Sequence, residues 1–311
     1  MPFFSVIIPL YNKEDYIEAT INSVLEQSFK DFEVIIVDDG STDNSYQLVS
    51  QFKDHRICII QQKNQGVSLT RNHGIHYANS KYIALLDADD LWKPNHLEVF
   101  YKSIQAFPDV DLYCNNYEIN YNKKIIKPAN HNFKDEQIPL IIDDFFKLNK
   151  SDSLIYTSCT CLRKTSLINL GMFKKQYDGA EDLDIWIKFA INHKMVYNPT
   201  VTMTYSRYIS NSLSKSNLNL NQFRLFYSLK HNEKKYPHMK SFVDLKRYGL
   251  ALRSKINGDN NIYFKTIKDI DFNNLSFKQK TLLKLPVSIL KFLNHMRTLV
   301  LNNSIYLRLF K

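Results

Sequence analysis

Short apolar runs alternate with helix-like segments over the first 90 residues, and this rhythm limits the folds open to the chain. The runs occupy residues 5–10, 32–37, 56–61 and 82–86. Between the first two, Ile17, Ile21 and Val24 recur at the spacing of one helical face. Strands that are apolar throughout are buried on both faces, as in parallel sheets covered by helices. We therefore predict an α/β fold with a mostly parallel sheet flanked by helices.

The remaining segments predict further elements. Helices are expected at residues 14–27, 66–78 and about 43–51, the last capped by Asp43. Further along, strands are expected at 110–115, 118–126 and 154–162, and helices at 139–148, 164–170 and 181–192. From about residue 217 the chain is helical, with little strand pattern.

Composition excludes several classes of protein. Hydrophobic residues make up 44% of the 311 and charged residues 23%, which supports a sizeable core and argues against bulk disorder. Neither GxGxxG nor GxxxxGK[ST] occurs, which argues against a Rossmann dinucleotide site or a P-loop. We expect no spanning helix, which needs roughly 18 apolar residues, and no signal peptide. The four cysteines form no CxxC pair, so free thiols in a reducing cytoplasm are expected rather than a disulfide or zinc site.

Charge divides the chain into two parts. Residues 1–215 contain 23 Lys+Arg and 26 Asp+Glu, whereas residues 216–311 contain 18 and 5, giving net charges of −3 and +13. Such asymmetry indicates either a separate surface-binding element or a nucleic-acid-binding arm. We predict a catalytic domain at 1–215 and a basic, mainly helical region at 216–311.

Acidic residues cluster where two of the predicted strands end. Asp38 and Asp39 follow the second strand, and Asp87, Asp89 and Asp90 follow the fourth. Ligands of parallel α/β sheets bind beyond the carboxyl ends of the strands. Carboxylates gathered there repel one another unless a cation or hydrogen-bond donors lie among them. A hard divalent metal with a nucleotide diphosphate would satisfy both clusters, although solvated turn residues remain the simpler alternative.

Four ordered strings in this sequence resemble a known family. They are Ser5-Val-Ile-Ile-Pro-Leu-Tyr-Asn12, Val34-Ile-Ile-Val-Asp-Asp-Gly-Ser-Thr-Asp43, Asn64-Gln-Gly-Val-Ser68 with Arg71-Asn72, and Leu86-Asp-Ala-Asp-Asp90. Gly171-Met-Phe173 and Glu181-Asp-Leu-Asp-Ile-Trp186 continue the likeness, which covers roughly residues 3–214. Together they resemble the family 2 inverting glycosyltransferases, which have the GT-A (Rossmann-like) fold. The resemblance does not extend to the basic C-terminal region.

The resemblance implies a donor site. The acidic residues after the second strand, Asp38 and Asp39, match the place that binds the uracil or ribose, and Arg71 matches an arginine near the nucleotide. Pro9 and Tyr11, in the first string, are expected beside the donor nucleotide.

The Asp-x-Asp motif of the family would bind the ribose through Asp87 and the metal through Asp89, with Asp87 close to the same ion. Mn²⁺ or Mg²⁺ would hold the two phosphates and stabilise the leaving diphosphate.

The resemblance also places a general base at an acidic pair that opens a helix. Glu181-Asp182 matches it, and Asp182, the second residue, is the expected base that takes the acceptor's proton. Carboxylates in the first turn of a helix are also favoured by its dipole alone. Asp184 should point to a different face and is the weaker candidate.

One segment departs from the family pattern. Relatives carry Arg-x-His before an Asn-Ser-x-Ser stretch over the donor phosphates. This chain has Arg207-Tyr-Ile-Ser-Asn-Ser-Leu-Ser214, with Ile209 where the histidine is expected. A phosphate-binding role is therefore predicted for Arg207 only.

The last segment combines apolar and basic residues. Ile289, Leu293, Met296 and Val300 recur at helical spacing among lysines and arginines. Such a helix can lie on an anionic membrane surface, or it can pack on the catalytic domain with its lysines solvated. No aromatic and basic recognition motif is visible, so nucleic acid is not an expected partner.

These observations predict an inverting glycosyltransferase of cell-surface polysaccharide synthesis. It would move a sugar from a nucleotide-diphosphate donor, a UDP sugar by expectation, to a hydroxyl of a saccharide acceptor on a lipid carrier. It would work in the cytoplasm, peripherally at the inner face of the membrane. The alternatives are an inactive membrane-associated binding protein and a sugar-nucleotide nucleotidyltransferase.

Overall fold

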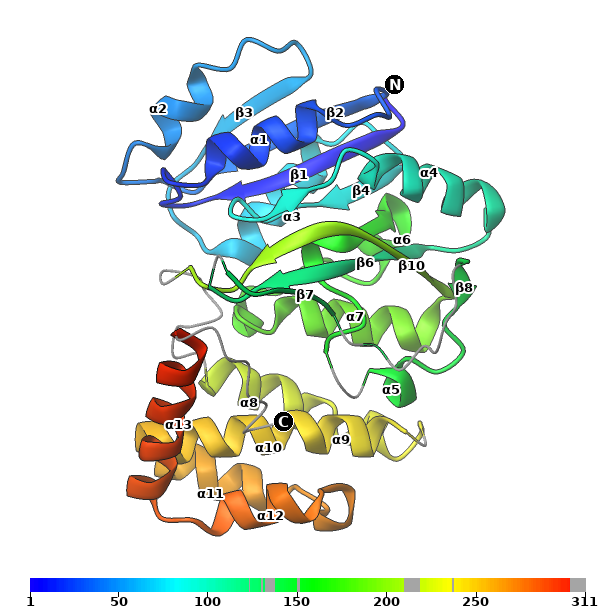
Figure 1. Ribbon diagram of the computed structural model, residues 1–311. Helices are drawn as coiled ribbons and strands as arrows, with labels where there is room; N and C mark the ends of the chain where they lie inside the picture. The colour runs from blue at the N-terminus through cyan, green and yellow to red at the C-terminus, as the bar shows by residue number, and fades with distance from the viewer. Residues whose placement is uncertain are drawn as a thin grey trace.

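The computed structural model describes residues 1–122, 124–129, 131, 138–149, 152–209, 219–236 and 238–302. A central sheet lies between helices, and a group of C-terminal helices lies at one end of the molecule (Figure 1). The strand order is β3-β2-β1-β4-β9-β6-β10-β5, with β7 on β6 and β8 on β10. The α/β class with a helix-flanked sheet is therefore confirmed.

The first half of the sheet is parallel and follows the predicted rhythm. Its strands are β1 (Phe4–Leu10), β2 (Phe32–Asp38), β3 (Ile57–Gln61) and β4 (Tyr82–Leu85). The intervening helices are α1 (Ile17–Leu25), α2 (Ser45–Ser50) and α3 (Val67–Tyr77). The N-cap of α2 is Asn44 rather than the predicted Asp43, although Asp43 Oδ1 accepts the N–H of Ser45, the first residue of the helix, at 2.9 Å. Strand β1 pairs with both β2 and β4, so the strand order changes direction at β1. Such a switch point opens a crevice at the carboxyl ends of the strands.

The second half of the sheet is mixed. It contains β6 (Leu112–Asn120), β7 (Ile126–Pro128), β8 (Leu140–Ile141), β9 (Thr160–Arg163), β10 (Met195–Ser206) and the short β5 (Leu91–Trp92). Strand β9 runs antiparallel between β4 and β6, whereas β10 is parallel to β6. The helices of this half are α4 (His96–Ala106), α5 (Phe145–Leu148), α6 (Lys164–Asn169) and α7 (Glu181–Asn192).

Alternating residues of each strand pack into two different cores. Val6 and Ile8 of β1 belong to a core shared with α1 and α4, whereas Ile7 belongs to a core shared with α3, α6 and α7. This alternation follows from the pleat of a strand, which sends successive side chains to opposite faces. The sheet is therefore buried on both faces, as its continuous apolar strands predicted.

Several predicted elements of the middle segment were wrong. The expected helix at 139–148 is β8 followed by the short α5, because the Asp144 side chain caps Lys147 N–H at 2.9 Å and starts the helix there. The expected strand at 154–162 is a 3-10 turn, η1 (Thr157–Cys159), followed by β9. The two strands expected at 110–115 and 118–126 are the single strand β6, and β7 comes after them. Helix α4 and strand β10 were not predicted.

The C-terminal region is helical, as predicted, over its described residues. Its helices are α8 (Asn219–Ser228), α9 (Lys230–Glu233), α10 (Met239–Asn257), α11 (Asn260–Lys268), α12 (Phe277–Lys284) and α13 (Val287–Asn302). Apolar side chains of α8 and α10, such as Leu225 and Phe242, join the same core as α7. The outer helices form a third core around α10, separate from the two cores of the sheet. The predicted boundary at 215/216 lies outside the described residues.

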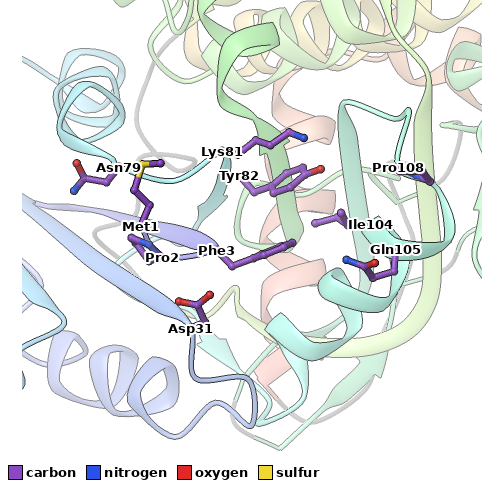
Figure 2. A pocket seen from close by; sticks show the side chains of 10 residues that line it. All are labelled: Met1, Pro2, Phe3, Asp31, Asn79, Lys81, Tyr82, Ile104, Gln105 and Pro108. Atoms are coloured by element: carbon purple, nitrogen blue, oxygen red, sulfur yellow. The ribbon is translucent and has the colours of Figure 1, made fainter.

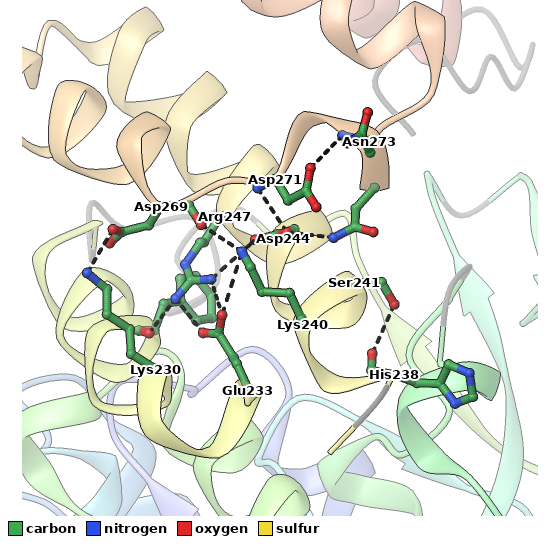
Figure 3. Close-up of polar contacts among 12 residues, drawn as sticks. Lys230, Glu233, His238, Lys240, Ser241, Asp244, Arg247, Asp269, Asp271 and Asn273 are labelled. Carbon is green, nitrogen blue, oxygen red and sulfur yellow. Dashed lines mark hydrogen bonds and ion pairs between the residues drawn. The ribbon is translucent and has the colours of Figure 1, made fainter. Parts of the chain in front are cut away.

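A buried polar network fixes α10 within this region (Figure 3). Arg247, 1% exposed, donates to both carboxylate oxygens of Glu233 at 2.5 and 2.8 Å and to Asp244 at 3.2 Å. Asp244 is fully buried and also accepts from Lys240 and from the Asp271 N–H. Buried charges that are all paired in this way specify one arrangement of the helices.

Candidate active site

The predicted donor and metal residues gather at the carboxyl edge of β1, β2 and β4. Asp39 follows β2 and donates its N–H to Leu10 at the end of β1 at 2.8 Å. Asp87 follows β4, the other neighbour of β1. The two acidic clusters therefore flank the switch point, where the sequence placed them.

Asp39 organises the loop that leads into α3. Its Oδ1 accepts the Gln65 N–H at 2.8 Å, and its Oδ2 accepts the Gly66 N–H at 2.9 Å. Gly66 has φ of +94°, a conformation that favours glycine, and an added Cβ would also lie 2.5 Å from Oδ2 of Asp178, whose side chain would have to shift. The buried Asp38 accepts the Ser41 N–H at 3.2 Å and the Gln61 amide at 3.3 Å. Both buried aspartates thus order the loops at the carboxyl edge of the sheet.

Arg71 on α3 joins the two acidic motifs of the site. The side chain is 5% exposed, and it donates to Asp87 Oδ1 at 2.7 Å and to Glu181 Oε1 at 2.6 Å. Its guanidinium lies 5.4 Å from the ring centroid of Phe173. The arginine therefore fixes the start of α7 against the end of β4.

The Asp-x-Asp segment is paired rather than open. Asp89 Oδ2 lies 2.7 Å from the Lys13 ammonium, and the two side chains are 16% and 13% exposed. Asp90 is buried, accepts the Ser158 hydroxyl at 2.6 Å, and has a pKa raised well above its usual value by burial. Burial also raises the pKa of Asp89, although the Lys13 ammonium opposes the shift.

Glu181 and Asp182 open α7 and have different surroundings. Besides Arg71, Glu181 accepts the Gly179 N–H at 2.5 Å, so it is held at both oxygens. Asp182 is half-buried, and its Oδ1 accepts the Leu183 N–H at 2.6 Å. Burial, followed by the nearby Glu181 charge, raises the pKa of Asp182 to about 6. A carboxylate of this kind is a stronger base than an exposed aspartate.

Asp184 does not share this setting. It is buried and forms an ion pair with Lys188 at 2.5 Å on the same helix. The pairing is the one expected of an i,i+4 contact. Asp184 therefore remains the weaker candidate for a base.

The remaining predicted donor residues lie around the same edge. Pro9 pairs in register with Val37, and Tyr11 has 45% of its surface exposed. Arg207 follows β10, is exposed, and lies with its guanidinium 5.5 Å from the ring centroid of Tyr121. The serines predicted after it, at 210–214, lie outside the described residues.

Three features of the site were not predicted. Lys13 donates to Asp89, and only its position directly after the first family-like string could have suggested a role. Ser158 bonds Asp90 from the η1 turn, which was predicted as a strand. Tyr156 stands beside the acidic cluster, with its ring 4.6 Å from that of Tyr205 and 5.2 Å from that of Tyr117. These contacts join residues that are distant in sequence, so no local pattern signals them.

No protein-only metal site is present among the described residues, because no three or more His, Cys, Asp or Glu side chains gather in a metal-binding arrangement. Asp87 and Asp89 nevertheless supply carboxylate oxygens at the predicted position. Mg²⁺ is commonly bound by one or two carboxylates together with substrate phosphates. The residues present therefore fit an ion that is shared with a diphosphate.

A cavity of about 430 Å³ lies at the opposite edge of the sheet (Figure 2). Phe3 and Tyr82, at the amino ends of β1 and β4, line it, and none of the predicted site residues do. Ligands of such sheets bind at the carboxyl ends. This cavity is therefore separate from the candidate active site. Among the described residues, no helix combines the length and apolar character needed to span a bilayer.

Several known proteins are similar in sequence to this chain. TuaG of Bacillus subtilis, named as a teichuronic acid biosynthesis glycosyltransferase, is 45% identical over 100 residues, or 31% of this chain and 40% of that protein. GlyA of Streptococcus pneumoniae, a glycosyltransferase, is 36% identical over 115 residues, or 36% of this chain and 16% of that protein. An uncharacterised glycosyltransferase of Rickettsia felis is 35% identical over 191 residues, or 60% of this chain and 30% of that protein. The chain thus spans less than half the length of these relatives.

Among solved structures, S. aureus TarS 1–349 in complex with UDP-GlcNAc superposes with a TM-score of 0.70 at 18% identity, covering 98% of this chain and 93% of that one. This likeness confirms the expected GT-A fold. The family model named glycosyl transferase family 2 matches residues 5–171, more than half of the chain. On the strength of this match, the chain belongs to glycosyl transferase family 2.

Proposed function

We propose that the chain transfers a sugar from a nucleotide-diphosphate donor to a hydroxyl of a saccharide acceptor, with inversion at the anomeric carbon. The observation that carries this proposal is Asp182. Its pKa is raised to about 6, and it stands at the start of a helix that Arg71 ties to the Asp87 strand end. A base is thereby held next to the edge where a donor would bind.

Asp182 acts as the general base in this proposal. The acceptor oxygen forms a bond to C1 of the sugar while Asp182 takes its proton, and the bond from C1 to the diphosphate oxygen breaks. The nucleoside diphosphate leaves with that electron pair, and a single displacement inverts C1. General-base help of this kind contributes about 10² to 10⁴ in rate. Glu181 does not take the proton in this scheme, because Arg71 and Gly179 hold both of its oxygens.

The donor is proposed to be a UDP sugar. The TarS structures contain UDP-GlcNAc and UDP, which supports this choice of nucleotide. In this chain Asp38 and Asp39 order the loops at the carboxyl edge of the sheet, and the exposed Tyr11 ring directly follows β1, where a nucleotide base would stack on it. We also propose Pro9, Arg71 and Arg207 as donor-site residues. Of these, Arg207 is proposed to bind the donor phosphates.

Transfer is proposed to need Mn²⁺ or Mg²⁺. Asp89 and Asp87 would hold the ion together with the donor diphosphate. When bound, it supplies Lewis-acid stabilisation of the leaving diphosphate. Arg71 keeps one oxygen of Asp87 in place by a 2.7 Å contact, which would orient that carboxylate toward the donor.

The acceptor is proposed to be a growing surface saccharide on a lipid carrier, at the cytoplasmic face of the membrane. The name of TuaG supports a cell-surface polymer. Helix α13 supports the proposal that the protein contacts the membrane. Its Leu290 is buried against the outer core, whereas its Ile289, Phe292 and Met296 are 43%, 61% and 39% exposed. Helices with an exposed apolar stripe and basic neighbours bind anionic membrane surfaces.

A panel of nucleotide sugars tests the donor proposal. The fold should be stabilised by about 2.7 kcal/mol when the correct donor is present at 100 times its Kd. The same donor should be hydrolysed slowly with Mn²⁺ present, and Asp182→Asn should hydrolyse it more slowly still. Stabilisation by none of the nucleotide sugars, with or without metal, would contradict the proposal.

A further inference from the structure

The ammonium of Lys13 forms an ion pair with the carboxylate of Asp89, which is proposed to bind the metal. Its Nζ is 2.7 Å from Asp89 Oδ2, and the lysine side chain is only 13% exposed. Lys13 comes from the loop after β1, and Asp89 comes from the loop after β4. A charge-assisted hydrogen bond in such a protected place is stronger than a pair on the open surface.

The backbone holds Lys13 in position for this contact. Its N–H donates to the Ser45 hydroxyl at 2.7 Å, and its carbonyl accepts the N–H groups of Tyr16 and Ile17 at 2.9 and 3.0 Å. The ammonium also lies 6.0 Å from the ring centroid of Tyr16. The residue is therefore fixed at the start of α1, with its side chain directed at the acidic cluster.

We propose that Lys13 is a resident counter-cation of Asp89, which a divalent ion must displace. The inference rests on the proposed metal dependence. Without a nucleotide, the metal competes with an ammonium already bonded to its carboxylate. The phosphate oxygens of a donor diphosphate can bind the metal, and they can also replace Asp89 as the anionic partner of Lys13. Metal and donor should therefore bind together. Lys13 is a positioning residue that weakens binding of the metal when no donor is present.

Binding of Mn²⁺ to the free protein tests this inference without any sugar transfer. Unbound Mn²⁺ is measured by electron paramagnetic resonance in titrations without nucleotide. Lys13→Gln should bind Mn²⁺ about tenfold more tightly than the wild type, because one charge-assisted hydrogen bond no longer competes. Lys13→Arg, which keeps the charge, should bind like the wild type. The matched control is Lys93→Gln, which removes a lysine paired with Glu118 at 3.3 Å outside the site.

The outcomes separate this inference from the metal proposal itself. If Lys13→Gln binds Mn²⁺ no more tightly than the wild type, while Asp89→Asn abolishes binding, the inference is wrong and the metal site stands. If the tighter binding persists when Asp89→Asn is added, the ion is elsewhere and the inference is also wrong. If no variant binds Mn²⁺, even with UDP, the metal proposal fails and the inference fails with it. Lys13→Met, which keeps the aliphatic stem, replaces the glutamine variant if that variant melts early.

Discussion

Replacing Arg71 with methionine tests the link between the two acidic motifs. The substitution keeps a long side chain in the space between α3, β4 and α7 but removes both ion pairs. Glu181, 6% exposed, would lose its cationic partner in a buried place, and Asp87, 26% exposed, would be partly solvated. The cost therefore falls mainly on Glu181.

The expected loss of stability follows from that burial. Removing one partner of a buried ion pair costs about 3–5 kcal/mol, because the other charge is left uncompensated. Since water can reach Asp87, we expect the lower part of this range for Arg71→Met. For a chain of this size, such a loss lowers the melting temperature by about 10 °C. Arg71 also lowers the pKa of Asp182, so the variant's activity should require a higher pH.

Thermal unfolding of three variants provides the assay. Arg71→Met combined with Glu181→Gln should recover at least half of the lost stability, because the second change removes the unpaired charge. Arg56→Met is the control: it breaks the Arg56 and Asp54 pair, which is partly exposed and outside the site, and should cost at most about 1 kcal/mol. Equal melting temperatures for Arg71→Met and the wild type, or no recovery in the double variant, would refute the reasoning.

Three further predictions concern the pH dependence of activity, the stability of Asp182→Asn and membrane binding. Activity should fall about tenfold per pH unit below pH 6, where Asp182 becomes protonated. The raised pKa of Asp182 means that the folded state holds this proton more tightly than the unfolded chain does. The resulting contribution to the free energy of unfolding is complete below about pH 4 and is lost as pH rises through 6. Asp182→Asn, which never carries the buried charge, should therefore melt at a higher temperature than the wild type at about pH 7.5. A flat pH profile would contradict the assignment. Replacing Ile289, Phe292 and Met296 with serine should release the protein from anionic vesicles in sedimentation, whereas Ile168→Ser, an exposed apolar residue of the catalytic domain, should not. Retention of the triple variant would exclude α13 as the contact.

The parallel half of the sheet could be predicted because its signals are local. Each strand is a continuous apolar run, and each helix has its own periodicity. Strand β10 was missed because Asn198 and Pro199 interrupt its pattern. The structure accommodates them with irregular pairing between Asn198 and Met203 against β6, since proline cannot donate to a ladder. A strand with such an interruption carries no clear period.

In the site, too, residues within short motifs could be identified from the sequence, whereas their contact partners far along the chain could not. Ordered motifs identified Asp87, Asp89, Glu181 and Asp182, which the structure gathers at one edge of the sheet. Their partners could not be read from spacing, because Arg71 and Glu181 are 110 residues apart. Such pairs depend on how the helices pack, which involves the whole core. The shared core of α7, α8 and α10 was hidden in the same way, because charge alone separated the C-terminal region.

The general-base role of Asp182 is the central claim, and single-turnover transfer by Asp182→Asn tests it most directly. The asparagine keeps the shape and the contact to the Leu183 N–H but cannot take a proton in this pH range. With the donor and metal saturating, transfer should fall by about 10² to 10⁴, while the Kd of the nucleotide, measured calorimetrically, changes by less than about threefold. Transfer at the wild-type rate, or lost nucleotide binding with unchanged transfer at saturation, would contradict the account.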